Sequence, residues 1–348
     1  MKKRINSYFK ENNISRQGGF SMYLKASIMA AIFTVPLILL SCNVVSHPLL
    51  VILFYLISGI GMAGIGMGIM HDANHGSLSK RSTVNNIFSR SLDFMGCSSA
   101  VWKLQHNVKH HTYTNIHDHD EDIEAPFFLA FSPNSKIYWI HRFQHIYAWF
   151  FYMLTTLNWV TIKDFIALKK YYNEGLITSK KEYRIEILRT IGWKLFYYSY
   201  VLVLPLIFND ASVGVILLGF MFSHFLTGFL ISVIFQLAHV MPDMSFPVTE
   251  DKELDINWYV HQMENTANFS PNSGLLSWFI GGLNFQIEHH LFPNVCHVHY
   301  KKISKIIADT AKEYQVPYHV NRYFVVALWR HMKTLRSIGR NKVALPQV

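Results

Sequence analysis

The sequence is short of cysteine and of charge for a chain of 348 residues. Its 3 cysteines are odd in number and widely spaced, which excludes a disulfide framework and a Cys-x-x-Cys zinc site. Charged residues make up 16% of the chain, against about 25% in ordinary soluble domains. Because hydrophobic residues reach 51%, the composition favours one membrane protein with a large cytoplasmic cap over two or three soluble domains.

Motifs that bind common redox cofactors are also missing. The sequence has no glycine-rich dinucleotide fingerprint and no iron–sulfur cysteine spacing. It has no His-Pro-Gly-Gly segment of the kind that binds haem, and neither a Glu-x-x-His nor a His-Glu-x-x-His pair. If the chain carries out a redox reaction, its electrons must come from a separate protein.

The chain is nevertheless basic, with a net charge of +10. A nucleic-acid-binding protein would carry its Lys and Arg residues as a stripe on a polar domain. Here they flank apolar stretches instead. This pattern favours an anionic membrane surface as the partner and argues against nucleic acid.

Four apolar stretches are long enough to cross a bilayer. The second carries no charged residue, and its 22 residues at 1.5 Å each span about 33 Å, enough for a hydrocarbon core of about 30 Å. In chain order, the four predicted spans are residues 26–42, 49–70, 193–208 and 213–238. The connections at 43–48 and 209–212 leave room only for a tight reversal, so we expect two helical hairpins.

Lys and Arg residues set the expected orientation. They precede the first span, follow the second and precede the third, whereas neither short connection has any. By the positive-inside rule, both termini and the long central segment are expected in the cytoplasm. We therefore divide the chain into a cytoplasmic N-terminal segment (1–25), a membrane and cap domain (26–310) and a cytoplasmic C-terminal segment (311–348).

Two further stretches are expected at the membrane surface. Residues 138–160 are rich in aromatics but contain several polar residues. We expect an interfacial helix there, with a fifth span as the alternative, because a fifth span would put the next basic segment on the wrong side. Residues 84–103 are predicted to form a second interfacial piece.

Most of the 19 histidines stand in short groups. The groups read His-Asp-Ala-Asn-His at 71–75, His-Asn-Val-Lys-His-His at 106–111 and Gln-Ile-Glu-His-His at 286–290, and a lone His239 ends the fourth span. Histidines four residues apart share one face of a helix. The topology places all of these groups at the cytoplasmic side. The candidate metal ligands are His71, His75, His106, His110, His111, His239, His289 and His290.

Imidazole is the commonest metal ligand in proteins and suits iron, zinc and copper. A single zinc ion takes three or four protein ligands. Eight histidines are too many for one ion, but they suit two ions with positions left open for oxygen. The pattern therefore predicts a metal pair at the cytoplasmic ends of the spans.

The same segments resemble a known family. HDANH, HNVKHH and QIEHH are similar to the three histidine boxes of membrane fatty acid desaturases. The wider segments WKLQHNVKHHTYTNI, HQMENTANF and GGLNFQIEHHLFP resemble bacterial members of the front-end and acyl-lipid branch, in which Gln286 stands where many members have histidine. The resemblance covers about residues 50 to 310. It implies an all-α integral membrane fold, with four spans in two hairpins and a helical cytoplasmic cap that holds two irons.

Roles are also expected for individual residues outside the eight histidines. Gln286 matches the position of a lost ligand, and His261 is a candidate to bind metal or to lie beside it. Asp72 is expected to hold neighbouring imidazoles in the right tautomer. Trp102, Trp258 and Tyr259 are candidates to line a substrate channel. The acidic residues Asp118, Asp120, Glu121 and Asp122, which follow the second group closely, are expected to form a solvated loop, with a role in orienting the imidazoles as the alternative.

The expected activity is oxygen-dependent desaturation of a fatty acyl chain, giving a cis double bond. Two non-haem irons would be the cofactor and O2 the co-substrate. The acyl carrier is open between coenzyme A, a carrier protein and a lipid. A separate ferredoxin or cytochrome b5-like donor, with its reductase, would supply electrons. The expected location is the bacterial inner membrane.

Other functions are compatible with parts of this pattern. A lipid hydroxylase would use the same iron site, and the sequence separates it poorly from a desaturase. A zinc-dependent membrane hydrolase would need only three or four ligands and a catalytic carboxylate. A metal transporter would carry several ionisable groups within its spans, where few are found, His224 among them.

Overall fold

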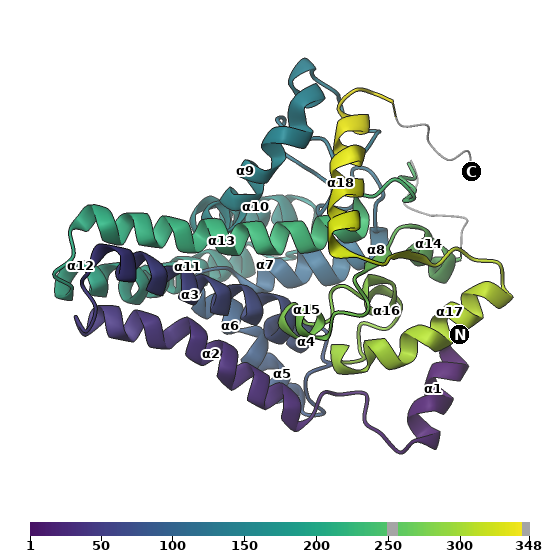
Figure 1. Ribbon diagram of the computed structural model, residues 1–348, viewed down its shortest axis with the longest axis horizontal. Coiled ribbons are helices and arrows are strands. Elements are labelled where there is room, and N and C mark those ends of the chain that lie inside the picture. The colour runs from purple at the N-terminus through teal and green to yellow at the C-terminus, as the bar shows by residue number, and fades with distance from the viewer. Residues whose placement is uncertain (249–256, 343–348) are drawn as a thin grey trace.

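The structure, a computed structural model, describes residues 1–248 and 257–342, so the last six residues of the predicted C-terminal segment lie outside it. It is mostly helical, with little strand (Figure 1). Four continuous helices of the described residues are long and apolar enough to cross a membrane. They run over Phe20–Ser41, Pro48–Asn74, Lys180–Phe208 and Val213–His239. The predicted all-α class is thereby confirmed, and the number of candidate spans agrees with the prediction.

Two spans begin earlier than predicted. The first span, helix α2 (Phe20–Ser41), starts six residues before position 26. The third starts at Lys180 rather than 193 and joins α11 (Lys180–Tyr198), a π-helical segment and α12 (Leu204–Phe208). Hydropathy marks only the apolar part of a helix, whereas the cap marks its beginning. The Ser179 side chain accepts a hydrogen bond from the Glu182 backbone N–H and so caps α11.

The two short connections meet at one end of the molecule. The Asn43 side chain donates to Asp210 Oδ2 at 2.6 Å, and the Asp210 backbone N–H donates to Asn43 Oδ1 at 3.0 Å. Asn209 Nδ2 also donates to the carbonyls of Leu40 and Val45. These reversals lie at the left end in Figure 1, far from α4, α8 and α16, the short helices that carry parts of the histidine groups.

Close packing sets the second span against the fourth. The second joins α3 (Pro48–Gly64), a π-helical segment (Ile65–Met70) and α4 (His71–Asn74), and the fourth is α13 (Val213–His239). A Cβ added to Gly59 would lie 2.7 Å from the Ser223 carbonyl oxygen, and Thr227 Oγ1 donates to the Gly59 carbonyl at 2.9 Å. Small residues permit such close approach of membrane helices. The packing brings the ends of both spans, with their histidines, to the same side.

The segment predicted as one interfacial piece, residues 84–103, is instead broken into short helices. They are α5 (Ser82–Ser89), α6 (Ser91–Phe94) and α7 (Ser99–Lys103). Gly96 separates the last two with a φ of +77°, a conformation that other residues rarely adopt. The prediction of one continuous piece was therefore wrong.

The aromatic stretch predicted at 138–160 is helical and is not one of the four candidate spans. A 3-10 turn (Trp139–Phe143) leads into α9 (Gln144–Asn158), which continues through a π-helical segment (Trp159–Lys163) into α10 (Asp164–Asn173). The α9 helix packs along α13. It is fixed at its start by Gln144, whose Nε2 donates to the Leu335 carbonyl of a C-terminal helix.

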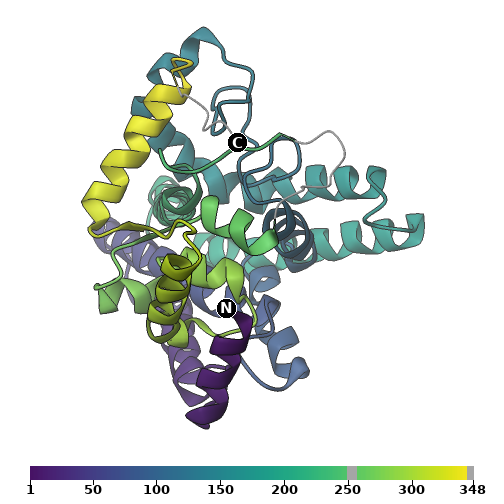
Figure 2. The same cartoon turned by 90° about the vertical axis from the view of Figure 1, so that its right-hand side faces the viewer.

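Short elements and the chain ends build the part that carries the histidine groups (Figure 2). Its helices are α1 (Lys2–Glu11), α8 (His111–Tyr113), α14 (Trp258–Glu264), α15 (Gly274–Phe279), α16 (Gln286–Leu291), α17 (Tyr300–Glu313) and α18 (Phe324–Ile338), with a 3-10 turn at His297–His299. The strands β1 (Ala267–Phe269) and β2 (His319–Asn321) pair in parallel, with Asn268 opposite Val320. The sequence did not predict this small sheet. It ties the segment before the third histidine group to the chain after α17.

Candidate metal centre

The eight predicted histidines converge. The ligand nitrogens of His71, His75, His106 and His289 all lie within 4.8 Å of one another and form the first metal group. Those of His110, His239 and His290 form the second metal group by the same measure. His111 lies between the two, because its ligand atom groups with both His289 and His290. All are buried except His75, which is partly exposed.

Irregular helices present these side chains. His71 directly follows the π-helical segment Ile65–Met70, and His106 and His110 lie in a second one, Leu104–His110. A π-helix bonds residues five apart, and such segments are frequent at functional sites. His106 and His111, five apart, accordingly come together with ring centroids 4.7 Å apart. The end of α13 adds His239, and α16 adds His289 and His290.

The imidazole nitrogens face one another too closely for hydrogen bonding alone to satisfy them. His111 Nε2 lies 3.0 Å from His289 Nε2 and 3.3 Å from His106 Nε2, and the latter is 3.1 Å from His71 Nε2. Each neutral imidazole has one N–H, so a chain of facing nitrogens leaves lone pairs unmatched. His75 Nε2 and His239 Nε2 are buried without a hydrogen-bond partner. Lone pairs that converge in this way fit bound cations, and an all-imidazole set suits iron, zinc or copper.

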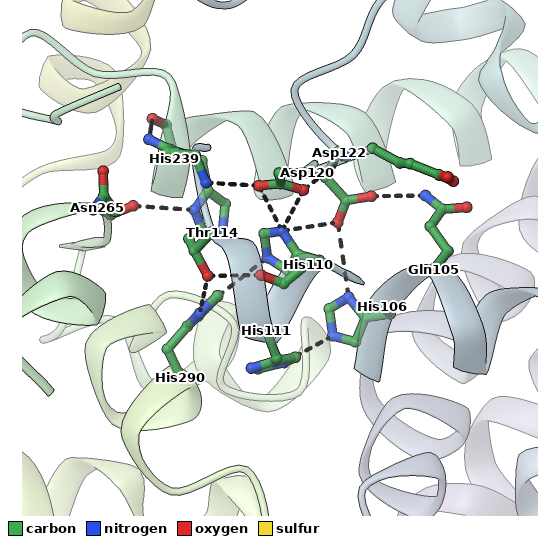
Figure 3. A network of polar contacts seen from close by, with 12 residues as sticks. Gln105, His106, His110, His111, Thr114, Asp120, Asp122, His239, Asn265 and His290 are labelled. Carbon is green, nitrogen blue, oxygen red and sulfur yellow. Dashed lines mark hydrogen bonds and ion pairs between the residues drawn. The ribbon is translucent and has the colours of Figure 1, made fainter. Parts of the chain in front are cut away.

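Other side chains fix the orientation of the rings (Figure 3). His110 Nδ1 donates to both carboxylate oxygens of Asp120, at 3.0 and 3.1 Å. His290 Nδ1 lies 2.8 Å from Gln262 Oε1, and His289 Nδ1 lies 3.2 Å from the Tyr300 hydroxyl. Contacts of this kind hold a ligand's second nitrogen and so select the tautomer that presents Nε2 to a metal.

Burial controls the charge of these rings. Loss of hydration, together with neighbouring imidazoles, lowers the pKa of His106, His111, His289 and His290 well below its usual range. We call these four the neutral set, and neutral imidazole is the form that binds metal. Burial would also lower the pKa of His110, but the charges of Asp120 and Asp122 outweigh it and raise that pKa to about 9.

The acidic segment after the second histidine group is not a solvated loop, so that prediction was wrong. Asp120 is fully buried, and its carboxylate also accepts from the backbone N–H groups of Asn115 and Asp122. Asp122 accepts from Gln105 Nε2 at 2.7 Å and faces His106 Nδ1 at 3.8 Å. Only Asp118, with an 83% exposed side chain, is solvated as predicted. The sequence signal was only that these acidic residues follow the second histidine group closely.

Three further candidates lie close by without joining a metal group. Gln286, buried at the start of α16, has neither side-chain polar atom hydrogen-bonded. His261 is buried, with Nδ1 near Asn265 and Nε2 unpartnered, but it belongs to no ligand group of the described residues. Asp72 turns away from the ligand rings and contacts Cys296 and His297 instead. It therefore does not hold a ligand imidazole directly.

A cavity of about 620 Å³ opens beside the first metal group, within the size range of small-molecule sites. Its wall includes His106 and Trp102, whose rings stack with centroids 4.3 Å apart. A smaller cavity of about 30 Å³ shares the walls Trp102, Trp159, Ile231 and Phe235 and reaches between the spans to Gly66. Trp258 and Tyr259, the other predicted channel residues, line neither cavity. They stack edge-to-face, and Trp258 is exposed at the surface.

A comparison with known families decides the identity. The family model described as "Fatty acid desaturase" matches residues 46–322 of this chain. The chain belongs to the fatty acid desaturase family. This confirms the resemblance seen in the histidine boxes. Desaturases are oxidoreductases, so the chain is an enzyme of lipid metabolism in membranes.

The desaturase is similar to curated relatives over nearly its whole length. It is 33% identical over 98% of its chain, and 92% of the relative, to "sn-1 linoleoyl-lipid 6-desaturase" of Arthrospira platensis. It is 36% identical over 99% of its chain, and 72% of the relative, to "Acyl-lipid (8-3)-desaturase" of Physcomitrium patens. It is also 33% identical over 98% of its chain, and 94% of the relative, to "sn-1 linoleoyl-lipid 6-desaturase" of Synechocystis sp..

Proposed function

We propose that this desaturase introduces a cis double bond into a fatty acyl chain at a di-iron centre held by the eight converging histidines. The observation that carries the proposal is their position: the buried imidazole nitrogens adjoin a largely apolar cavity through His106 and Trp102. The eight nitrogen ligands would leave metal positions free for oxygen. Gln286 and His261 would lie beside the metals without binding them.

When bound, the two irons would activate O2 as the oxidant for removing hydrogen from two neighbouring methylenes. The chain's own residues place the substrate and exclude water. Trp102 and Phe235 form the wall shared by both cavities, so an acyl chain running from the larger to the smaller one passes directly beside His106. Met62, Met67 and Met70 line the inner end, and their flexible thioethers suit a mobile alkyl chain.

The polar end of the larger cavity would hold the substrate's carbonyl end. Gln105, Asn158 and Lys163 line it and offer donors to an ester or carboxyl oxygen. The names of the relatives refer to acyl lipids, so we propose an acyl lipid as substrate. They also name double bonds near the carboxyl end, which agrees with the glutamine at position 286 in the third histidine box.

Two electrons and two protons must reach the site for each double bond formed, with O2 reduced to two waters. We propose a separate ferredoxin or cytochrome b5-like donor that docks on the cap, with both termini and the cap in the cytoplasm and the two hairpins in the bilayer. Exposed lysines on α17, namely Lys301, Lys302 and Lys305, suit an acidic carrier. The rate of reduction by such a donor should then fall as salt screens the charges.

The test is expression in a host with simple lipids, followed by mass spectrometry of its fatty acids and metal analysis of the purified protein. A product lighter by two mass units, with about two irons per chain, supports the desaturase. A gain of one oxygen would indicate a hydroxylase on the same site. One zinc and no iron would refute the di-iron centre and favour a hydrolase. His110→Ala and His289→Ala should each abolish activity and lower iron content while the protein still inserts into membranes.

A further inference from the structure

A lysine lies buried in the first span, close to the metal-binding end. Lys25 is only 2% exposed, and its ammonium Nζ lies 3.1 Å from His297 Nε2. These residues are 272 positions apart in the sequence. Isolated charges inside a membrane helix are costly, so they are paired and functional where they occur.

The charge is balanced through His297. His297 Nδ1 lies 2.7 Å from Asp72 Oδ2, which also accepts from Cys296 Sγ at 3.0 Å. An ammonium at one ring nitrogen and a carboxylate at the other fix the imidazole: Nε2 accepts from Lys25 and Nδ1–H donates to Asp72. The result is a buried chain of charge-assisted contacts, which we call the Lys–His–Asp chain (Lys25, His297 and Asp72).

The Lys–His–Asp chain could be mistaken for a third metal site. Asp72, Cys296 and His297 offer one carboxylate oxygen, one sulfur and one nitrogen, all within 4.8 Å of one another. The ammonium of Lys25, however, already provides the positive charge that balances Asp72, and it would repel a divalent cation at this position. The geometry therefore fits an ion triad and not a bound metal.

The position of Asp72 gives the Lys–His–Asp chain a function. Asp72 lies between His71 and His75, the first histidine pair, on α4, which is only four residues long. It follows a π-helical segment, a feature that is frequent at functional sites, and α4 is the last turn of the continuous helix Pro48–Asn74. Because helix ends fray, a side-chain anchor at this last turn helps to fix the direction in which the first histidine pair faces.

The contact between Asp72 and His297 also connects the two histidine boxes that contribute to the first metal group. His297 follows the third histidine box by seven residues, and His289 of that box shares the first metal group with the first histidine pair. A second contact supports the same alignment: Gly281, five residues before Gln286, packs so closely that an added Cβ would clash with the backbone of Gly68. Gly68 also leaves the room that Lys25 needs, since an added Cβ would lie 2.6 Å from Lys25 Nζ.

We propose that Asp72 is a positioning residue which, held by His297 and Lys25, aligns the first histidine pair with the third box at one of the two metals. The inference rests on the proposed di-iron centre, and it goes beyond the ligands themselves. It assigns the Lys–His–Asp chain to the first metal group only. The second metal group (His110, His239 and His290) has its own anchors at Asp120, Asn265 and Gln262.

The test uses the full-length enzyme in detergent, loaded with ⁵⁷Fe. Asp72→Asn and His297→Ala should change the Mössbauer signal of one iron and leave the other unaltered, with iron affinity at that site lowered about tenfold or more. Lys25→Met should act in the same direction but more weakly, because the contact between Asp72 and His297 survives. Lys25→Arg, which keeps the charge, should restore two irons with the wild-type spectrum.

A second buried ion pair provides a matched control. Lys194 Nζ lies 2.8 Å from Asp164 Oδ2, with both side chains buried and neither in a metal group. Lys194→Met should lower thermal stability but retain two irons with the wild-type spectrum. If the Lys25 and His297 variants behave like this control, the positioning role is wrong. If the wild-type protein binds no iron, the di-iron centre itself is wrong, and the two failures are thereby distinguished.

Discussion

The imidazole of His110 and the carboxylate of Asp120 form a fully buried pair, joined at 3.0 and 3.1 Å. Through this pair the loop after the second histidine box, which looks solvent-exposed from its composition, is folded against the converging histidines. The carboxylate keeps a proton on Nδ1 and leaves Nε2 directed at His290, 3.3 Å away.

Asp120→Asn should weaken the second metal group. An amide can keep the shape of the side chain but not its negative charge, so the basicity of His110 falls and its tautomer is less well fixed. We expect iron affinity to fall about 10- to 100-fold, with a matching loss of activity. Asp118→Asn is the control, because that side chain is exposed. Equal iron content in both variants would contradict the role of Asp120.

His239 and His261 should respond differently to substitution. His239 belongs to the second metal group, whereas His261 belongs to no ligand group of the described residues, although both are buried. His239→Ala leaves only two of three ligands in its group and should abolish activity and lose iron. His261→Ala should retain about two irons. Iron analysis of both purified variants checks this, and iron loss confined to His261→Ala would reverse the assignment.

Gly66 should limit the length of the acyl chain. It lines the smaller cavity, and an added Cβ would meet only Ile231 Cδ1, at 3.8 Å. Gly66→Leu would fill this cavity and should favour shorter acyl chains, by about tenfold for each methylene excluded. The measurement is the product distribution from mixed 16- and 18-carbon substrates.

A glycine on the exposed side of α11 serves as the control for this prediction. A Cβ added to Gly192 meets nothing within 4 Å, so Gly192→Leu should leave the distribution unchanged. An unchanged distribution in Gly66→Leu as well would mean that the alkyl end does not enter the smaller cavity.

The metal-free protein should lose stability in mild acid. In the unfolded chain histidine titrates near pH 6.5, whereas burial lowers the pKa of the four histidines of the neutral set. Below pH 6.5 the unfolded state therefore binds more protons, so the free energy of unfolding decreases as the pH falls. His110, with a pKa of about 9, contributes stability that is complete below pH 6.5 and is lost only as the pH rises toward 9.

Thermal unfolding of the metal-free protein between pH 7 and pH 5 checks this expectation. Glu288 opposes the trend, because burial raises its pKa to about 7, but it is one group against the four histidines of the neutral set. The iron-loaded protein should unfold at a higher temperature throughout. A melting temperature that rises steadily from pH 6.5 to pH 5 would contradict the neutral state of these ligands.

The sequence predicted well the features that depend on the spacing of residues close together along the chain. Apolar length gave the four spans, and the four-residue separation of His71 and His75 gave a shared helix face at the end of one of them. Such patterns need no knowledge of distant residues. They predicted all eight converging histidines from topology alone, before any distance was known.

The features that sequence missed depend on contacts between distant segments. Nothing near Asp72 indicates that it bonds His297, 225 positions away, and nothing near Lys25 indicates a buried partner. Asp120 was misread for a different reason: its partner His110 is only ten residues away, but acidity suggests solvent unless the burial is known. The breaks in residues 84–103 follow from tertiary packing: a Cβ added to Gly96 would lie 2.7 Å from the Tyr197 ring.

The joined reversals at the far end limit how this protein can be altered. Surface loops usually accept inserted residues. Here the Asn43 and Asp210 side chains and backbone bind each other directly, so extra length in either connection would part them and loosen both pairs of spans together. Reporter sequences for mapping membrane topology should therefore be attached at the chain ends. An epitope placed in either reversal would report on a molecule that it had itself rearranged.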